Sequence, residues 1–403
     1  MNRIVLIGNG FDLSHGLKTS YADFIKWYCD KIIDQLKNTR SQVFKNNHLE
    51  TKCESAGWSQ CFSFHYIEEE QTGYATLMKI IDNKYDYRTK LSPLFSHIIR
   101  SIETKNWVDI ENEYYFLLKD CAIRNNDAQA HSLNIQLQCL QELLIEYLNV
   151  INNQVFQIKN NIWKAIYEPI SPIDIAVDAT DRWNGYINSL ARTPKYVWRT
   201  KLDNYGISDE LKKEYLSDVD NYKYDPKTFF KPPYPFGLPD NIMLLNFNYT
   251  STAFHYLIPD NKFFTINQIH GQLEKPATVI FGYGDEMDDQ FKQIQNLNNQ
   301  EFLKNVKSIN YLNSSNYKKL IMLTESSPFQ IYIMGHSCGN SDRTLLHTLF
   351  EHKNCISIKP YYHVYEDGTD NYIEIVQNIS RSFNDMALMR DRVVNKTYCE
   401  SMN

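Results

Sequence analysis

The sequence predicts an α/β protein with a Rossmann-like, largely parallel sheet and a large helical insertion. Three observations predict this fold class. An apolar run, Ile4 to Ile7, leads directly into a glycine turn at Gly8 and Gly10. A long stretch with helical spacing of apolar residues follows it. Strand-like segments then alternate with helical ones from about residue 236 to the end, which is typical of a parallel α/β layer.

The first strand and turn resemble the start of a nucleotide-binding unit. A short continuous apolar run is typical of a parallel strand that is covered on both faces. Gly8 and Gly10 let the backbone bend sharply and approach a ligand without a Cβ in the way. Strand, turn and following helix together predict a phosphate or pyrophosphate cradle. The alternative is a turn that binds nothing.

The middle of the chain is predicted to be mostly helical. Residues 107–118 and 131–158 are expected to form helices, the second with a leucine stripe that begins at Leu133. The stripe suits plain core packing, an oligomer contact or a lid. Residues 231–239 contain four prolines, which cannot lie inside a helix or a central strand, and are predicted to be a linker.

The last third supplies the remaining strands. We expect strands over 242–247, 263–269, 278–281, 331–334 and 356–365, with helical stretches over 300–325, 341–352 and 371–392. The simplest assembly joins residues 1–30 to residues 236–403 as one nucleotide-binding domain. Residues 31–235 are then the helical insertion.

Composition narrows the class of protein. The chain has 403 residues, 43% hydrophobic and 22% charged, and its formal net charge of −6 argues against a surface devoted to nucleic acid. No apolar segment is long enough for a membrane span. The strand begins directly after Arg3 and leaves no room for a signal peptide. The eight cysteines form no C-x-x-C pair, so neither a metal site nor a disulfide framework is expected, and the expected location is the cytoplasm.

Two polar clusters follow predicted strands of the last third, where open α/β sheets bind ligands. In the first, Asn248 and Thr250 could hydrogen-bond a ribose hydroxyl, or either could cap a following helix. The second is His270 with Gly271. An imidazole titrates near neutral pH, so His270 could accept a proton, although a lone histidine at a strand end is more often structural.

A third cluster runs from Gly335 to Asp342. Gly335, Ser337 and Gly339 match the G-x-S-x-G nucleophile elbow of serine hydrolases. That fold needs an acid and a histidine after later strands, and the remaining residues supply no convincing pair. We therefore expect Ser337 and neighbouring backbone N–H groups to form a second phosphate or ribose cradle. A serine hydrolase remains an alternative.

The glycine turn also departs from the dinucleotide fingerprint of dehydrogenases. Leu13 stands where a G-x-G-x-x-G match from Gly8 requires its third glycine. No second strand with an acidic residue follows about 20 positions later, where the ribose contact belongs. A hydride-transferring Rossmann enzyme is therefore not expected.

Several blocks together resemble the AbiH family of bacterial abortive-infection proteins, which act against phage. The segment 6–24 is similar to the opening signature of that family. Later blocks that are similar to it are Trp107-Val-Asp-Ile-Glu111, Asn246-Phe-Asn-Tyr-Thr250, Ile269-His-Gly271 and the run Gly335-His-Ser337 to Ser341-Asp342.

The order of these blocks more distantly resembles the sirtuin-like superfamily, which binds NAD. The resemblance implies that Asn248 contacts the nicotinamide ribose and that His270 is the catalytic histidine. It also implies that Ser337 belongs to the nucleotide cradle, and we expect nucleotide contacts from Gly8, Asn9, Gly10, Asp12, Thr250, Gly335, Ser337 and Asp342. Thr250 stands in place of an aspartate and Asn9 in place of a small residue. The structural zinc cysteines of sirtuin deacetylases are absent from the sequence.

These resemblances imply an antiphage effector that hydrolyses NAD at the nicotinamide–ribose bond. NAD is then the substrate, and no prosthetic group is expected. The alternatives are a sensor that binds NAD or ADP-ribose without cleaving it, and the serine hydrolase that uses Ser337. The expected partners are a small nucleotide, a second copy of the chain, or a trigger derived from phage.

Overall fold

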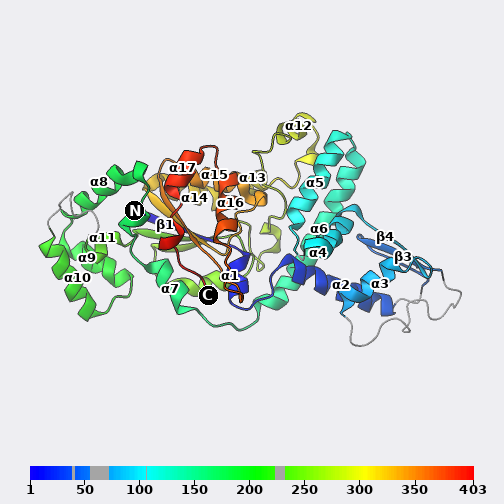
Figure 1. Cartoon of the computed structure of the whole chain (residues 1–403), viewed down its shortest axis with the longest axis horizontal. Coiled ribbons are helices and arrows are strands. Elements are labelled where there is room, and N and C mark those ends of the chain that lie inside the picture. Colours follow the sequence, from blue (N-terminus) through cyan, green and yellow to red (C-terminus); the bar gives the residue numbers. More distant parts are fainter. Residues whose placement is uncertain (39–40, 55–71, 106, 223–231) are drawn as a thin grey trace. The chain divides into compact units, whose positions relative to one another are not determined.

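The structure is a computed structural model that describes residues 1–38, 41–54, 72–105, 107–222 and 232–403. It divides into two compact units, coloured along the sequence in Figure 1. The first unit contains residues 1–17, 155–279 and 311–403, and the second contains residues 18–154 and 280–310. In the ranges described, no helix is both long and apolar enough to cross a membrane.

The first unit is built on a five-stranded parallel sheet, which confirms the predicted Rossmann-like α/β fold. The strand order is β6-β5-β1-β7-β8. Its strands are β1 (Asn2–Ile7), β5 (Asn241–Asn246), β6 (Phe264–Gln268), β7 (Phe329–Met334) and β8 (Cys355–Tyr361). The first strand pairs in parallel with β5 on one side and with β7 on the other, so the start of the chain does share a sheet with its last third.

The order of the strands locates the edge where ligands bind in such sheets. Numbered along the chain, the five strands lie in the order 3-2-1-4-5, as in the dinucleotide-binding fold. The strand order reverses between β1 and β7. The loops that leave the carboxyl ends of these two strands therefore occupy the switch point. These are the loops that begin at Gly8 and at Gly335.

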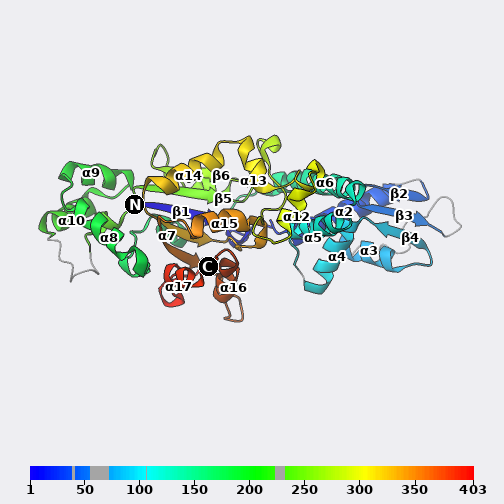
Figure 2. The ribbon, with the colours of Figure 1, turned by 90° about the horizontal axis from the view of Figure 1, so that it is seen from above.

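Helices surround this sheet. Figure 2 shows α14 and α17 above and below it. Helix α7 packs on the sheet face that carries Val5, Ile242 and Tyr332. The α-helices of the unit are α1 (Asn9–Ser14), α7 (Asn160–Tyr167), α8 (Thr180–Leu190), α9 (Lys195–Asn204), α10 (Asp209–Asn221), α11 (Tyr234–Gly237), α14 (Asn316–Ser326), α15 (Arg343–Phe350), α16 (Tyr372–Arg381) and α17 (Met386–Arg392).

Residues 155–222 belong with the sheet, whereas the sequence pattern predicts that they are part of the helical insertion. Helices α8 to α11 enclose Trp183, Trp198 and Phe236, which form one buried cluster with Met1. Because Phe236 is part of this core, the predicted proline linker contains a packed helix, α11. The first residue of the predicted linker, Lys231, lies outside the described residues.

A buried polar network also ties this segment to the sheet. The guanidinium of Arg3 donates to the carbonyls of Ile166 and Glu168 at 2.8 and 2.7 Å. The Lys359 ammonium lies 3.2 Å from the Asp174 carboxylate. Burial raises the pKa of Asp174, and Lys359 opposes that shift. These contacts join residues that are far apart in sequence, so sequence periodicity could not reveal them.

The second unit is mainly helical, as expected, but it also contains a small antiparallel sheet that was not predicted. The sheet has the order β2-β3-β4, seen side by side in Figure 2. Its elements are β2 (Val43–Lys45), β3 (Leu49–Cys53), β4 (Tyr87–Leu91), α2 (Tyr21–Asn38), α3 (Gly73–Asp82), α4 (Pro93–Lys105), α5 (Ile110–Ile123), α6 (Asp127–Asn152), α12 (Phe291–Asn296) and α13 (Lys307–Asn310). The leucine stripe of α6 is buried in this unit, which confirms core packing as its role.

Residues 280–310 join this unit through a buried ion pair. The Glu111 carboxylate lies 2.9 Å from the Lys307 ammonium and accepts a hydrogen bond from the Gly282 amide at 3.0 Å. In the same sequence block, Asp109 caps α5 by accepting from the Asn112 amide, while Trp107 is 59% exposed. The block therefore has a structural role in starting α5 and in holding the 280–310 segment.

Several short turns replace elements that were expected to be longer. The predicted strand over 278–281 is wrong, because residues 276–278 form a 3-10 turn and residues 279–281 are irregular. The helical stretch over 300–325 is broken into short turns and α14 (Asn316–Ser326), and the stretch over 371–392 is α16 followed by α17. The other 3-10 turns are η1 (Pro172–Asp174), η2 (Val177–Ala179), η3 (Thr252–Tyr256), η5 (Gln300–Phe302), η6 (Tyr311–Asn313), η7 (Asn340–Asp342) and η8 (Lys396–Tyr398).

Candidate functional site

The loops after β1 and β7 interlock at the switch point. The Gly10 amide donates to the Gly335 carbonyl at 2.8 Å, and the Gly8 amide donates to the Met334 carbonyl at 3.3 Å. A Cβ on Gly8 would lie 2.5 Å from the His336 Cα. Gly335 has φ +75°, and a Cβ there would lie 2.0 Å from the Phe11 nitrogen. These glycines therefore allow two backbones to pack against each other.

This packing gives the glycine turn a different role from the phosphate cradle that its sequence predicts. The amides of Gly8 and Gly10 already donate to backbone carbonyls, so other groups of these loops would have to contact a pyrophosphate. Asn9 begins α1 and is exposed. Helix α1 has only six residues.

The loop after β5 is held by Asn246. Its side-chain carbonyl accepts from the Asn248 amide at 3.1 Å, and its amide nitrogen donates to Gln268 at 2.7 Å. The side chain of Asn248 donates to the Gly8 carbonyl at 3.0 Å. Asn248 is partly exposed, whereas Asn246 is buried. Asn248 thus links the loops after β5 and β1.

Thr250 and Asp12 form a second link between these loops. The Thr250 hydroxyl donates to the Asp12 carboxylate at 2.5 Å, and both residues are 1% exposed. Burial raises the pKa of Asp12 to about 6, against the opposing effect of hydrogen bonds that include the one from Thr250. The alternative in which Asn248 or Thr250 caps a helix is wrong. The next helical element is the 3-10 turn η3, and its N-cap position is occupied by Ser251.

The pKa of Asp12 predicts a pH dependence of stability. The folded state keeps the Asp12 proton up to about pH 6, whereas an unfolded aspartate loses it near pH 4. The free energy of unfolding should therefore fall by about 3 kcal/mol as the pH rises through this window. Urea titrations at pH 4 to 7 measure this free energy. It should decrease less steeply with rising pH in Asp12→Asn than in the wild type. The exposed-site variant Asp218→Asn should keep the slope of the wild type. An unchanged slope in Asp12→Asn would refute this account.

His270 lies at the end of β6 in a buried group of polar and aromatic side chains. It is 4% exposed, and its Nε2 lies 3.1 Å from Asp342 Oδ1 and 3.2 Å from the Tyr311 hydroxyl. Its ring meets Phe247 edge to face, with the ring centroids 5.2 Å apart. Because a carboxylate only accepts hydrogen bonds, Asp342 holds the proton on Nε2 and leaves Nδ1 as the basic nitrogen of the neutral ring.

The Asp342 carboxylate also faces a second histidine, His336. The Nε2 of His336 lies 3.5 Å from Asp342 Oδ2, and its Nδ1 accepts from the Cys338 amide at 3.0 Å. The acceptor role of Nδ1 leaves the proton of the neutral ring on Nε2, directed toward Asp342. Asp342 is thus shared between two histidines from different loops. Sequence reasoning missed His336 and Tyr311, although His336 stands inside the third predicted cluster.

Ser337 is not part of this buried group. It is exposed, and its carbonyl accepts from the Asn378 amide at 2.8 Å. In the part of the chain that the structure describes, no hydrogen bond joins its hydroxyl to a histidine. The residues of the loop with positive φ are Gly335 and Cys338, at +75° and +54°. The contact between serine and base that the serine hydrolase alternative requires is therefore not seen.

The structure thus brings five of the predicted residues into two groups at the carboxyl edge of the sheet. Asn248, Thr250 and Asp12 join the loops after β5 and β1. His270 and Asp342 join the loops after β6 and β7. These residues come from segments up to 330 positions apart, and the parallel sheet aligns the ends of all their strands.

Comparison with known proteins identifies one family. The model of the family described as bacteriophage abortive infection AbiH matches residues 4–363, a span that contains both groups. No curated protein matches the chain, and no solved structure matches it. The family match covers most of the sequence, including residues 4–7 of β1 and the whole of the other four strands of the parallel sheet. This chain belongs to the AbiH family of bacteriophage abortive infection proteins.

Proposed function

We propose that this protein acts in phage abortive infection by hydrolysing NAD at the nicotinamide–ribose bond. Membership of the AbiH family supports the abortive-infection role. The observation that carries the proposed chemistry is the pairing of His270 with Asp342 at the carboxyl edge of a sheet with the dinucleotide-binding strand order.

In the proposed reaction, the bond between C1′ of the ribose and the nicotinamide nitrogen breaks, and its electron pair leaves with nicotinamide. Water forms the new bond to C1′. His270 takes the proton of that water at Nδ1 and later releases it to solvent, so the products are nicotinamide, ADP-ribose and a proton. The ribose acquires oxocarbenium character during this step, so a fixed sugar and a positioned base are the main requirements.

The other residues of the site have distinct roles in this proposal. Asn248 positions the ribose from the loop after β5. Asp342 orients His270 and stabilises the imidazolium that forms when the ring accepts the proton. Nucleotide contacts by Asn9, Thr250 and Ser337 remain predictions. No prosthetic group takes part in the proposed step.

The direct test is to incubate the purified full chain with NAD and measure free nicotinamide and ADP-ribose by liquid chromatography. We expect the two products in equal amounts, without transfer of ADP-ribose to protein. If no nicotinamide appears, with or without extract from phage-infected cells, the hydrolase proposal is wrong. Binding of NAD without release of nicotinamide would instead support the sensor.

A further inference from the structure

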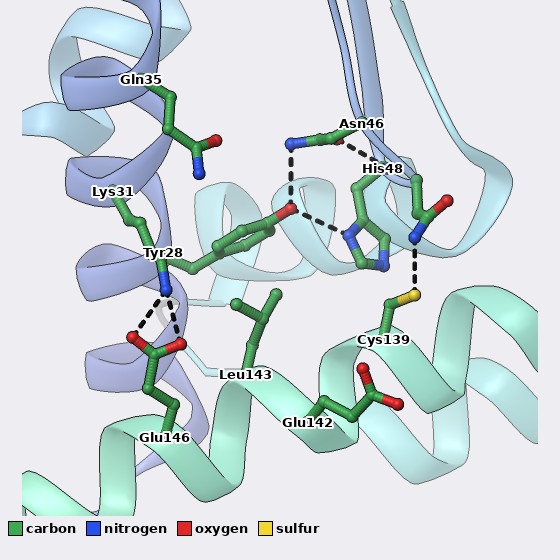
Figure 3. A pocket seen from close by; sticks show the side chains of 10 residues that line it. Tyr28, Lys31, Gln35, Asn46, His48, Cys139, Glu142, Leu143 and Glu146 are labelled. Carbon is green, nitrogen blue, oxygen red and sulfur yellow. Dashed lines mark hydrogen bonds and ion pairs between the residues drawn. The ribbon is translucent and has the colours of Figure 1, made fainter.

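The second unit contains a pocket that the proposed reaction does not use. Its volume is about 300 Å³, within the range of small-molecule sites. Figure 3 shows side chains that line it from three places: helix α2, the turn between β2 and β3, and helix α6. All of them belong to the second unit, so nothing about this pocket rests on the proposed NAD chemistry.

One wall of the pocket is a hydrogen-bonded chain of uncharged side chains. Asn46 donates to the Tyr28 hydroxyl at 3.2 Å, and Tyr28 lies 2.9 Å from His48 Nδ1. The other nitrogen of His48 faces the Gln136 carbonyl at 3.0 Å, so it carries the proton and Nδ1 accepts from Tyr28. Burial lowers the pKa of His48, which keeps the ring neutral. The chain gives this wall a fixed shape.

The charges of the pocket lie on its two helices. Lys31 on α2 forms an ion pair with Glu146 on α6 at 2.5 Å. Glu142 lies one turn earlier on α6, where one of its oxygens accepts from the Gln138 amide at 3.2 Å. Within the described residues, Glu142 has no ion-pair partner. Burial raises the pKa of the neighbouring Cys139 thiol, which therefore adds no charge at neutral pH. The lining thus carries two carboxylates and one ammonium.

We infer that this pocket binds a small polar molecule that carries a protonated amino group. The excess carboxylate favours a cation over an anion, and the lysine that could attract an anion is already paired with Glu146. A metal ion is a poorer fit, because no three histidine, cysteine, aspartate or glutamate side chains of the described chain are placed to hold one. Glu142 receives the amino group, and the Asn46 amide and the Tyr28 hydroxyl of the fixed wall contact the polar body of the ligand.

The test uses three probes of similar length that differ at one end: 4-amino-1-butanol, 1,4-butanediol and 4-hydroxybutyrate. Each is titrated into the full chain, and binding is followed by saturation-transfer NMR. We expect the amine to bind more tightly than the diol and the carboxylate. Glu142→Gln, which keeps the shape of the side chain, should weaken amine binding about two- to fivefold, as expected for loss of one contact between exposed charges.

Glu103→Gln is the matched control, because Glu103 is an exposed residue of the same unit and does not line the pocket. It should bind the amine like the wild type. The inference is overturned if the amine does not bind at millimolar concentration, or if the diol or carboxylate binds equally well. It is also overturned if Glu142→Gln binds the amine as the wild type does, or if Glu103→Gln loses as much affinity.

Discussion

Replacement of His270 by alanine is expected to lower the rate of nicotinamide release by about 10²–10⁴-fold, the usual contribution of a general base. The proposed reaction needs a group that accepts the proton of the attacking water, and His270 is the base oriented by Asp342 at 3.1 Å. Protection of cells against phage should be lost in parallel. Product formation by purified protein and plaque counts in cells measure the two effects.

Two further variants separate catalysis from folding. His270→Gln retains an amide that can reach Asp342 but lacks a basic nitrogen, so it should fold like the wild type and remain inactive. His255→Ala removes an exposed histidine of the same unit and should keep full activity. Thermal unfolding of each variant shows whether the fold is retained. A His270→Ala protein that still releases nicotinamide at the wild-type rate would exclude the proposed base.

The largest effect on stability is expected for Gly335→Ala. Gly335 has φ +75°, where an L side chain is strained, and its added Cβ would lie 2.0 Å from a backbone nitrogen and 2.5 Å from a backbone carbon of the facing loop. Neither loop can yield without breaking the hydrogen bond from Gly10. We expect the free energy of unfolding to decrease by more than about 4 kcal/mol, a value typical of severe core defects. Recovery of soluble protein should be poor.

Gly368→Ala provides a closely matched comparison. Gly368 also has a left-handed backbone, with φ +82°, but a Cβ there would meet nothing within 4 Å. Gly368→Ala should therefore lower the free energy of unfolding only by the penalty of the left-handed conformation, about 1–2 kcal/mol. Urea unfolding of the two variants separates the penalty of the left-handed conformation from that of the contact between loops. Equal losses would show that the interlocked turns contribute nothing beyond backbone strain.

The sequence alone was sufficient for the fold class and the family. Strands β1, β5, β7 and β8 are buried along most or all of their length, so their apolar runs were visible without any knowledge of their neighbours. Glycines at the strand ends marked the turns. The blocks quoted from residue 6 to residue 342 resembled the AbiH family, and the family match covers them.

Local pattern was a poorer guide where burial depends on distant partners. Strand β3 alternates buried and exposed residues over only five positions, too few to distinguish it from its helical surroundings. Residues 280–310 contact the helical unit through the pair between Lys307 and Glu111, which are 196 positions apart. Arg3 holds the segment near Glu168 against the sheet in the same way. The division into units follows such contacts and differs from the domain boundaries predicted from the sequence.

The same limit applies to the site. The sequence predicted His270 and Asp342 as site residues of two separate clusters, because each follows a predicted strand. Only the tertiary structure placed the imidazole 3.1 Å from the carboxylate and added His336 and Tyr311 to the group. It also showed that Gly8, Gly10 and Gly335 serve the packing of two loops. Residue type and local periodicity indicate only whether a residue prefers burial or a turn. Which loops pair with each other depends on the order of strands in the sheet, and only long-range packing decides that order.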